Sequence, residues 1–256
     1  MAASWEHITV DNVPMKTYLA VPSGEGPFPG VVVAQHASGV DTFIQTVCDR
    51  LAQAGYAAAA PDLYHRQTGM TFEELGRMRR DDPKRWPAMM GKAQQMRDDE
   101  IESDVTATVV FLRGLAQVGG SSIGITGFCG GGRIAYLMAA RNQTLAAAAV
   151  FHGGSILATR GESPSPFDLT GQISCPVAGF FGDDDENPSK DDVAKIDAEM
   201  DRLGKAHQFH SYPDTGHAFL DFSNPKAYRE GSAADAWDKL VVFFGETLKA
   251  AVGAAS

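Results

Sequence analysis

The stretch Gly127-Phe128-Cys129-Gly130-Gly131 follows an apolar run over residues 123–126 and precedes a helix-like segment over residues 133–138. A strand that turns sharply into a helix holds one side chain in a strained position at the sheet edge, so small residues are needed two positions to either side of it. Here that side chain is Cys129, and the helix N-terminus beside it favours thiolate over thiol. The pattern predicts a nucleophilic cysteine. The alternative is that the glycines only let a helix pack closely and that Cys129 is a small buried apolar residue.

Apolar runs and amphipathic helices alternate on both sides of this stretch. Residues 5–21 alternate in hydrophobicity around a turn and predict two antiparallel strands. Further strands are predicted over residues 31–34, 56–60, 145–151, 177–181 and 208–212, and helices over residues 42–54, 98–115, 193–203 and 234–249. Continuous apolar runs between helices are typical of parallel strands buried on both faces. We therefore predict a single α/β domain over residues 1–256, with helices on both faces of a mostly parallel central sheet.

Composition excludes several classes of function. The net charge of -10 repels phosphate and anionic lipid, so neither nucleic acid nor a membrane is an expected partner. No segment approaches a membrane-spanning length, and the first residues lack a signal-peptide pattern. The three cysteines are odd in number and widely spaced, which fits free thiols better than a disulfide framework or a CxxC metal site. We expect a cytoplasmic monomer or homodimer that acts on a small molecule.

Residues 66–97 interrupt the regular alternation and differ in charge from the rest of the chain. This insert has a net charge of +4, whereas the remainder has -14, and it contains five of the nine methionines. Methionine is a flexible apolar residue that suits adaptable pockets. We interpret the insert as lid-like, lying over the sheet edge and favouring an anionic substrate. The alternative is that its charges are solvated helix faces.

A thiol nucleophile needs a base and an acid that orients the base, on loops at the carboxyl ends of neighbouring strands. The loop over residues 182–188, which contains Asp183, Asp184 and Asp185, follows one predicted strand, and a loop with His217 follows the next. Nucleophile, acid and histidine then occur in the chain order that α/β-hydrolases use. Taken alone, His217 could equally be a surface or core histidine.

These motifs resemble the dienelactone hydrolase family of α/β-hydrolases. The resemblance rests on GFCGG at 127–131, G-x-x-D-x-x-P at 182–188, GHAF at 216–219 and PDLY at 61–64, and it extends from about residue 16 to 248. It implies the α/β-hydrolase fold with Cys129 as nucleophile and His217 as base and then acid. It also implies that Asp185, chosen among the three acids by the spacing, orients His217 and stabilises the imidazolium.

The resemblance further implies hydrolysis of a small ester or lactone through a thioester on Cys129, with no metal or organic cofactor. Backbone N–H groups must hold the tetrahedral oxyanion. Gly130, the residue after the nucleophile, is one expected donor, and the family resemblance selects Ala37 as the other.

Two departures from the family pattern bear on the substrate. His36 stands where the family has a glutamate that gates the thiol, and Asp221 stands where an arginine holds the substrate carboxylate. We expect His36 to interact with the thiolate or the bound acyl group, the alternative being a loop histidine bonded to backbone. Any substrate anion is then expected to be held by three lid cations, Arg66, Arg79 or Arg80. Two further strand-end residues, Tyr64 and His152, are expected to line the pocket, although Tyr64 could simply pack and His152 could belong only to a turn.

Two other classes of function compete with this interpretation. Residues 130–135 match the dinucleotide fingerprint G-x-G-x-x-A after a strand, which suggests a nicotinamide-dependent oxidoreductase. The acidic ribose ligand expected about twenty residues later is missing, because the next strand ends Val150-Phe151-His152. The other class is a non-catalytic small-molecule-binding protein on the hydrolase scaffold, since fold does not fix function.

Overall fold

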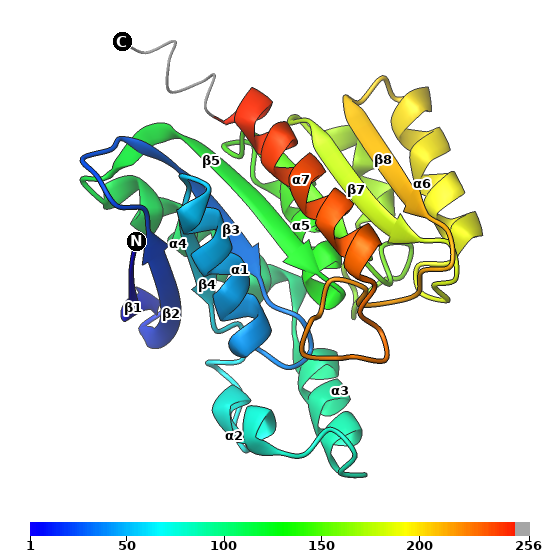
Figure 1. Cartoon of the computed structure of the whole chain (residues 1–256), viewed down its shortest axis with the longest axis horizontal. Coiled ribbons are helices and arrows are strands. Elements are labelled where there is room, and N and C mark those ends of the chain that lie inside the picture. Colours follow the sequence, from blue (N-terminus) through cyan, green and yellow to red (C-terminus); the bar gives the residue numbers. More distant parts are fainter. Residues whose placement is uncertain (249–256) are drawn as a thin grey trace.

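The computed structural model describes residues 1–248, apart from the side chains of residues 119–121. Within this range eight strands form one sheet in the order β1-β2-β4-β3-β5-β6-β7-β8 (Figure 1). The strands are β1 (Ala2–Val10), β2 (Val13–Val21), β3 (Phe28–Ala34), β4 (Ala57–Pro61), β5 (Val118–Phe128), β6 (Ala147–Phe151), β7 (Val177–Gly182) and β8 (His207–Tyr212). The β1–β2 and β2–β4 pairs are antiparallel and the others are parallel. The carboxyl ends of the parallel strands therefore meet along one edge of the sheet.

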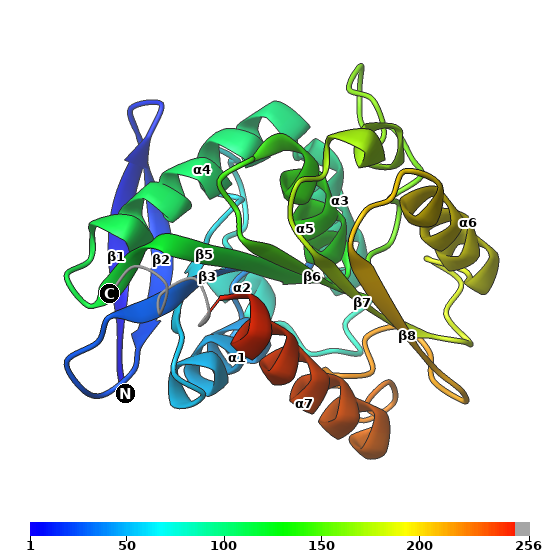
Figure 2. The ribbon, with the colours of Figure 1, turned by 90° about the horizontal axis from the view of Figure 1, so that it is seen from above.

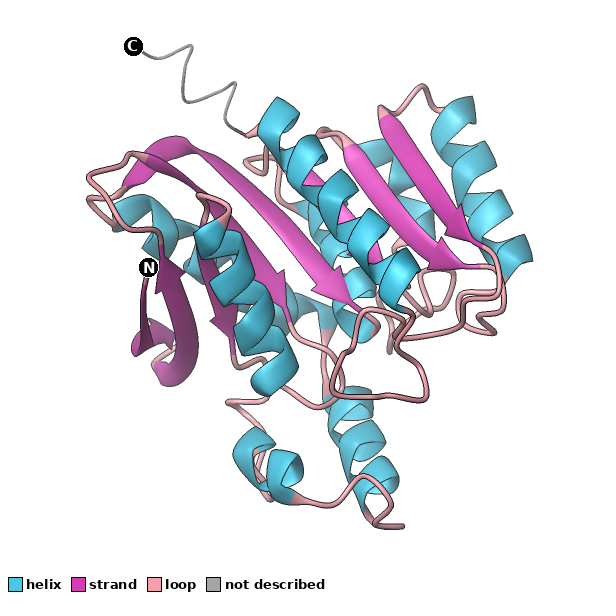
Figure 3. Cartoon of the chain, in the orientation of Figure 1, coloured by secondary structure: helices cyan, strands magenta, loops and turns pink. Residues whose placement is uncertain are grey.

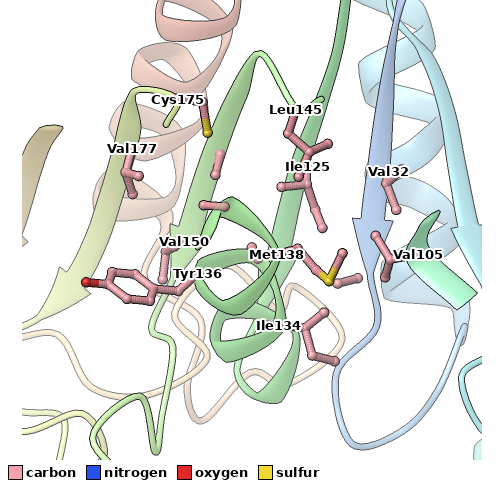
Figure 4. Packing of buried hydrophobic residues seen from close by; sticks show 14 of the residues in the cluster. Val32, Val105, Ile125, Ile134, Tyr136, Met138, Leu145, Val150, Cys175 and Val177 are labelled. Atoms are coloured by element: carbon pink, nitrogen blue, oxygen red, sulfur yellow. The ribbon is translucent and has the colours of Figure 1, made fainter. Parts of the chain in front are cut away.

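Helices cover both faces of the sheet (Figure 2). One face carries α1 (Thr42–Gln53) and α7 (Glu230–Thr247), and the other carries α4 (Asp98–Gly114), α5 (Gly130–Arg141) and α6 (Lys190–Arg202). Each face has its own buried hydrophobic cluster. Under α5, for example, Ile134 and Met138 belong to the cluster that contains Ile125 and Val150 of the sheet (Figure 4). The predicted α/β architecture is confirmed.

Most element boundaries agree with the sequence patterns because local signals mark them. The Asp41 side chain accepts hydrogen bonds from two N–H groups at the start of α1, and Ser189 forms a capping box with Asp192 at the start of α6. Between β6 and β7, where the sequence patterns predict neither a strand nor a helix, the chain forms a short 3-10 helix, η1 (Phe167–Gln172). The last residue of the predicted closing helix, Lys249, and the end of the predicted domain at residue 256 lie outside the described residues.

The insert forms two short helices, α2 (Phe72–Arg77) and α3 (Arg85–Gln95), beyond the carboxyl ends of the sheet strands (Figure 3). Two of the ion pairs that connect it to the body of the molecule involve its helical part. Lys16 of β2 contacts Glu73 at 2.5 Å, and Arg80 between the two helices contacts Asp221 at 3.3 Å. The insert therefore adjoins the edge of the sheet at which Cys129 lies.

A buried ion pair ties α5 to the start of α4. The guanidinium of Arg133 donates to both carboxylate oxygens of Asp98, at 2.7 and 3.0 Å. The two side chains are 2% and 0% exposed. Such a bidentate pair satisfies both charges, but either partner alone would be a desolvated charge without compensation.

Replacing Asp98 with asparagine should therefore lower the free energy of unfolding by about 3–5 kcal/mol, because it leaves the Arg133 charge buried and unpaired. The matched control is Asp99→Asn in the same helical turn, whose exposed pair with Arg97 should contribute less than about 1 kcal/mol. Urea unfolding followed by circular dichroism measures both. Equal losses in the two variants would contradict the role given to the buried pair.

Candidate active site

The turn between β5 and α5 holds Cys129 at a φ of 57°, in the left-handed region. Close backbone contacts explain the small residues around it. A Cβ on Gly127 would lie 2.0 Å from the carbonyl oxygen of Gly131, and one on Gly131 would lie 2.2 Å from that of Ala34. No larger side chain fits at either position without moving backbone. Cys129 is therefore the residue that projects from the turn, at the N-terminus of α5.

The loops after β7 and β8 bring an acid to a histidine. They approach so closely that a Cβ on Gly182 would lie 2.2 Å from the carbonyl oxygen of Thr215. Nδ1 of His217 lies 2.7 Å from Oδ2 of Asp185, whose side chain is 2% exposed. The other carboxylate oxygen accepts from the N–H of Asn187 at 2.9 Å, so both oxygens are fixed. Contact with the carboxylate at Nδ1 leaves Nε2 as the free edge of the His217 ring.

The two neighbouring acids are placed differently. Asp183 pairs with Lys190 at 3.0 Å, and Asp184 is exposed. Of the three consecutive aspartates, Asp185 is the one beside His217.

Cys129 and His217 share a side-chain hydrogen bond that moves both pKa values. Burial alone would raise the pKa of the thiol, but the hydrogen bond and charge of His217, the charge of His36 and the N–H of Gly130 together hold it below its usual value. Burial alone would lower the pKa of His217, but its bonds to Asp185 and Cys129 raise it to about 10. Both shifts favour a Cys129 thiolate paired with a His217 imidazolium.

Two cavities open in front of the thiol. We call the first, of about 610 Å³, the α5 cavity, because Arg133 and Ile134 of α5 form part of its wall. The second, of about 780 Å³, is the lid cavity, because Arg85 and Met89 of α3 line it. Both cavities share six residues: His36, Ala37, Trp86, Met90, Cys129 and His217. We call this set the junction.

The expected oxyanion donors lie beside Cys129. Gly130 is the first residue of α5, so its N–H has no acceptor within the helix. Ala37 belongs to the junction, and its carbonyl oxygen accepts from the hydroxyl of Tyr64 at 3.1 Å, which holds this loop. Both residues line the α5 cavity with the thiol, and so does Tyr64.

His152 supports the turn from the end of β6. Its Nδ1 accepts from the N–H of Cys129 at 3.1 Å, which places the ring proton on Nε2. The ring is 4.7 Å from that of His217, and the residue lines the lid cavity. Burial, with repulsion from His217 and His36, holds the pKa of His152 well below 6.5, so the ring is neutral.

The three lid cations expected to hold an anion are not brought together. Arg79 and Arg80 line the lid cavity, with Arg79 exposed and bonded to Asp81. Arg66 lies outside the walls of both cavities, and its guanidinium contacts Asp104 at 2.5 Å and Asp11 at 2.7 Å. The buried carboxylate of Asp104 on α4 binds the Arg66 guanidinium, so this side chain does not reach the cavities in front of the thiol.

Sequence reasoning missed several cations that line the cavities, including Arg85 and Arg160. Arg85 is 8% exposed and lines the lid cavity, and within the described residues its one side-chain hydrogen bond is from Nε to the carbonyl oxygen of Leu75 at 3.4 Å. Arg160, in the loop before η1, lines the α5 cavity and lies 3.5 Å from Asp98. Arg85 was one of eight cations in a basic insert, and Arg160 belongs to no motif, so no sequence signal ranked either.

The second glycine position of the apparent dinucleotide motif, Gly132, serves packing. A Cβ on Gly132 would lie 2.7 Å from the Cα of Gly153, so this glycine lets α5 approach the end of β6. Within residues 1–248 no group of three or more histidine, cysteine, aspartate or glutamate side chains has the arrangement of a metal site. In the same range no helix is long and apolar enough to cross a bilayer.

A mostly parallel sheet with a nucleophile turn after β5 and an acid and a histidine on later loops defines an α/β-hydrolase. The model of the dienelactone hydrolase family matches residues 15–248, and the chain belongs to that family. A relative from Methylorubrum extorquens named "Putative carboxymethylenebutenolidase" is 33% identical over 229 residues, which cover 89% of this chain and 75% of that protein. A Synechocystis protein of the same name is 34% identical over 247 residues, covering 93% of this chain and 94% of that protein.

Solved structures agree with this assignment. The crystal structure titled "Putative Dienelactone Hydrolase" from Klebsiella pneumoniae superposes with a TM-score of 0.83 at 30% identity. The match covers 95% of this chain and 98% of that one.

Iodoacetamide should alkylate Cys129 alone at neutral pH, because alkylation follows the thiolate fraction. Burial raises the pKa of Cys48, and it raises that of Cys175 to about 11, so both stay protonated. As pH falls, the rate should stay high below the ordinary thiol pKa of about 8.5 and decline only through the lowered pKa of Cys129. Mass spectrometry of the labelled peptides gives the rate and the site.

The variant His217→Ala should move the decline of the alkylation rate to higher pH, whereas the control Asp183→Asn should leave it unchanged. If the alkylation rate of the wild-type protein had its midpoint at about pH 8.5, the ion pair between Cys129 and His217 would be contradicted.

Proposed function

We propose that this protein hydrolyses a small ester or lactone through a thioester on Cys129. The observation that carries the proposal is the continuous contact from Asp185 through His217 to Cys129, at the junction of two cavities. A nucleophile, a base and an orienting acid in contact are the machinery of acyl transfer. The names of the relatives, carboxymethylenebutenolidase and dienelactone hydrolase, support the same class of reaction.

In the acylation step the Cys129 thiolate attacks the substrate carbonyl carbon. The N–H groups of Gly130 and Ala37 are proposed to bind the oxyanion, and loss of one such donor typically costs about 3 kcal/mol of transition-state stabilisation. The imidazolium of His217 then donates its proton to the leaving alkoxide, and the C–O bond breaks. The products of this step are the thioester, neutral His217 and an alcohol, which leaves in the case of an ester and stays attached to the acyl group in the case of a lactone.

In the deacylation step His217 removes a proton from water, which attacks the thioester carbonyl. The second tetrahedral intermediate expels the Cys129 thiolate and releases the carboxylic acid. The carboxylate of Asp185 stabilises the imidazolium formed in this step, and the resting ion pair is restored.

The lid cavity suits an anionic group on the substrate. Arg80 reaches it but is paired with Asp221, whereas Arg85 is buried there and its guanidinium makes a single weak hydrogen bond among the described residues. A buried guanidinium in this state gains most from a carboxylate, which it can bind through two parallel hydrogen bonds. We therefore place Arg85, with Arg80 beside it, as the anchor for a substrate carboxylate, in place of the expected Arg66.

A cytoplasmic location is part of the proposal. All three cysteines are free, and a reducing compartment keeps a nucleophilic thiol available.

The direct test is mass spectrometry of the protein quenched during turnover of p-nitrophenyl acetate. The expected result is an acetyl adduct on Cys129, with a burst of p-nitrophenol that Cys129→Ala and prior iodoacetamide treatment abolish. Cys175→Ala, a buried thiol on the α6 side, is the matched control and should retain the burst. No burst with any short ester or lactone would favour a binding protein on the hydrolase scaffold.

The anion anchor predicts a charge-dependent loss of specificity. Arg85→Gln should lower kcat/KM for a carboxylate-bearing ester by roughly 10- to 100-fold relative to its neutral isostere, since a hydrogen bond to a charged group contributes about 1.5–3 kcal/mol. Arg79→Gln, which removes an exposed cation from the same cavity, should leave the ratio within about twofold. An unchanged ratio in Arg85→Gln would rule out this anchor.

A further inference from the structure

His36 and Asp41 form a second imidazole–carboxylate contact close to the thiol. Nε2 of His36 lies 2.9 Å from Oδ1 of Asp41, off the direction of an ideal hydrogen bond, and the side chains are 14% and 12% exposed. The carboxylate cannot easily move away, because the same oxygen accepts from the N–H groups of Phe43 and Ile44 at the start of α1. The ring packs against Phe43, with 5.5 Å between ring centroids.

The position of this contact connects it to the reaction. His36 belongs to the junction, together with Cys129, His217 and Ala37. It also directly precedes Ala37, the expected oxyanion donor. Its Nδ1 makes no hydrogen bond within the described residues, so this polar edge of the ring is not committed to the protein.

The charges around His36 favour its protonated form. Burial lowers its pKa, but Asp41, the Cys129 thiolate and Asp221 together raise it above 6.5. Two other basic groups lie close by. The charge of His36 helps to keep His152 neutral, so His152 adds no positive charge beside it. Arg85 interacts with the charges of Asp41 and Asp221, the same two carboxylates that act on His36. The pKa of Asp41 is lowered in turn, so the shifts of both groups favour an imidazolium–carboxylate ion pair.

We propose that His36 and Asp41 form a permanent imidazolium–carboxylate pair whose positive charge stabilises the Cys129 thiolate alongside His217. The proposal rests on the proposed function and deepens it. His217 must lose and regain its proton in each turnover, whereas no step of ester hydrolysis consumes the proton of His36. The thiolate is stabilised both as the attacking group in acylation and as the leaving group in deacylation.

The test uses two variants that remove the charge in different ways. His36→Gln replaces the imidazolium with a neutral amide, and Asp41→Asn removes the carboxylate while keeping a side chain that caps helices equally well. Asp49→Asn is the control on the same helix, because Asp49 contacts Tyr18 and not His36. Ultraviolet absorbance measures the Cys129 thiolate against pH, with Cys129→Ala as the blank.

Both variants should raise the apparent pKa of the thiol, by roughly one unit or more in His36→Gln. The acidic limb of kcat/KM should move to higher pH by the same amount, while the basic limb set by His217 stays in place. If His36 and Asp41 had a purely structural role, the variants would lower activity without moving the acidic limb. Titration curves identical to wild type in both variants would overturn the proposal.

Failure of the proposed function gives a different result. If the thiol pKa shifts as expected but no acyl adduct forms on Cys129 with any ester, the hydrolase assignment fails and the ion pair stands.

Discussion

The strained backbone of Cys129 is the constraint on which the rest of the site depends. A non-glycine residue in such a conformation is destabilised by roughly 1–3 kcal/mol, and the surrounding structure must hold it there. Its N–H is shared between the carbonyl oxygen of Phe151 and Nδ1 of His152, each at 3.1 Å. The close approach of Gly127 and Gly131 then leaves the chain no room to relax. The sulfur is fixed before substrate arrives, so the other groups need only be placed relative to it.

The elements that the sequence predicted well depend on local patterns. Glycine spacing around Cys129 and the alternation of strands and helices are both visible without tertiary contacts. The meeting of Asp185 and His217 followed from chain order, because parallel strands end at one edge of a sheet. The choice of Asp185 over its two neighbours came from the resemblance to a family, and the residues alone left it open.

The charges at the site were harder to predict, because each ion pair depends on partners distant in the sequence. Arg66 is the clearest example: Asp104 on α4, thirty-eight residues later, holds it away from both cavities. Arg85 carries the same charge but has no carboxylate in contact, so it remains available in the lid cavity. Asp41 has the sequence pattern of a helix cap, and its second contact, with His36, is visible only in three dimensions.

The distribution of cysteines over the fold has a consequence for oxidative damage. Cys48 belongs to the cluster on the α1 and α7 face, and Cys175 to the cluster on the opposite face, so both lie inside hydrophobic packing. A thiolate such as Cys129 is the form that peroxide converts to sulfenic acid. Neither of the other sulfurs is exposed to trap that acid as an internal disulfide, so recovery depends on a thiol supplied from outside the protein. Without such a reductant, a further oxidation step would inactivate the enzyme irreversibly.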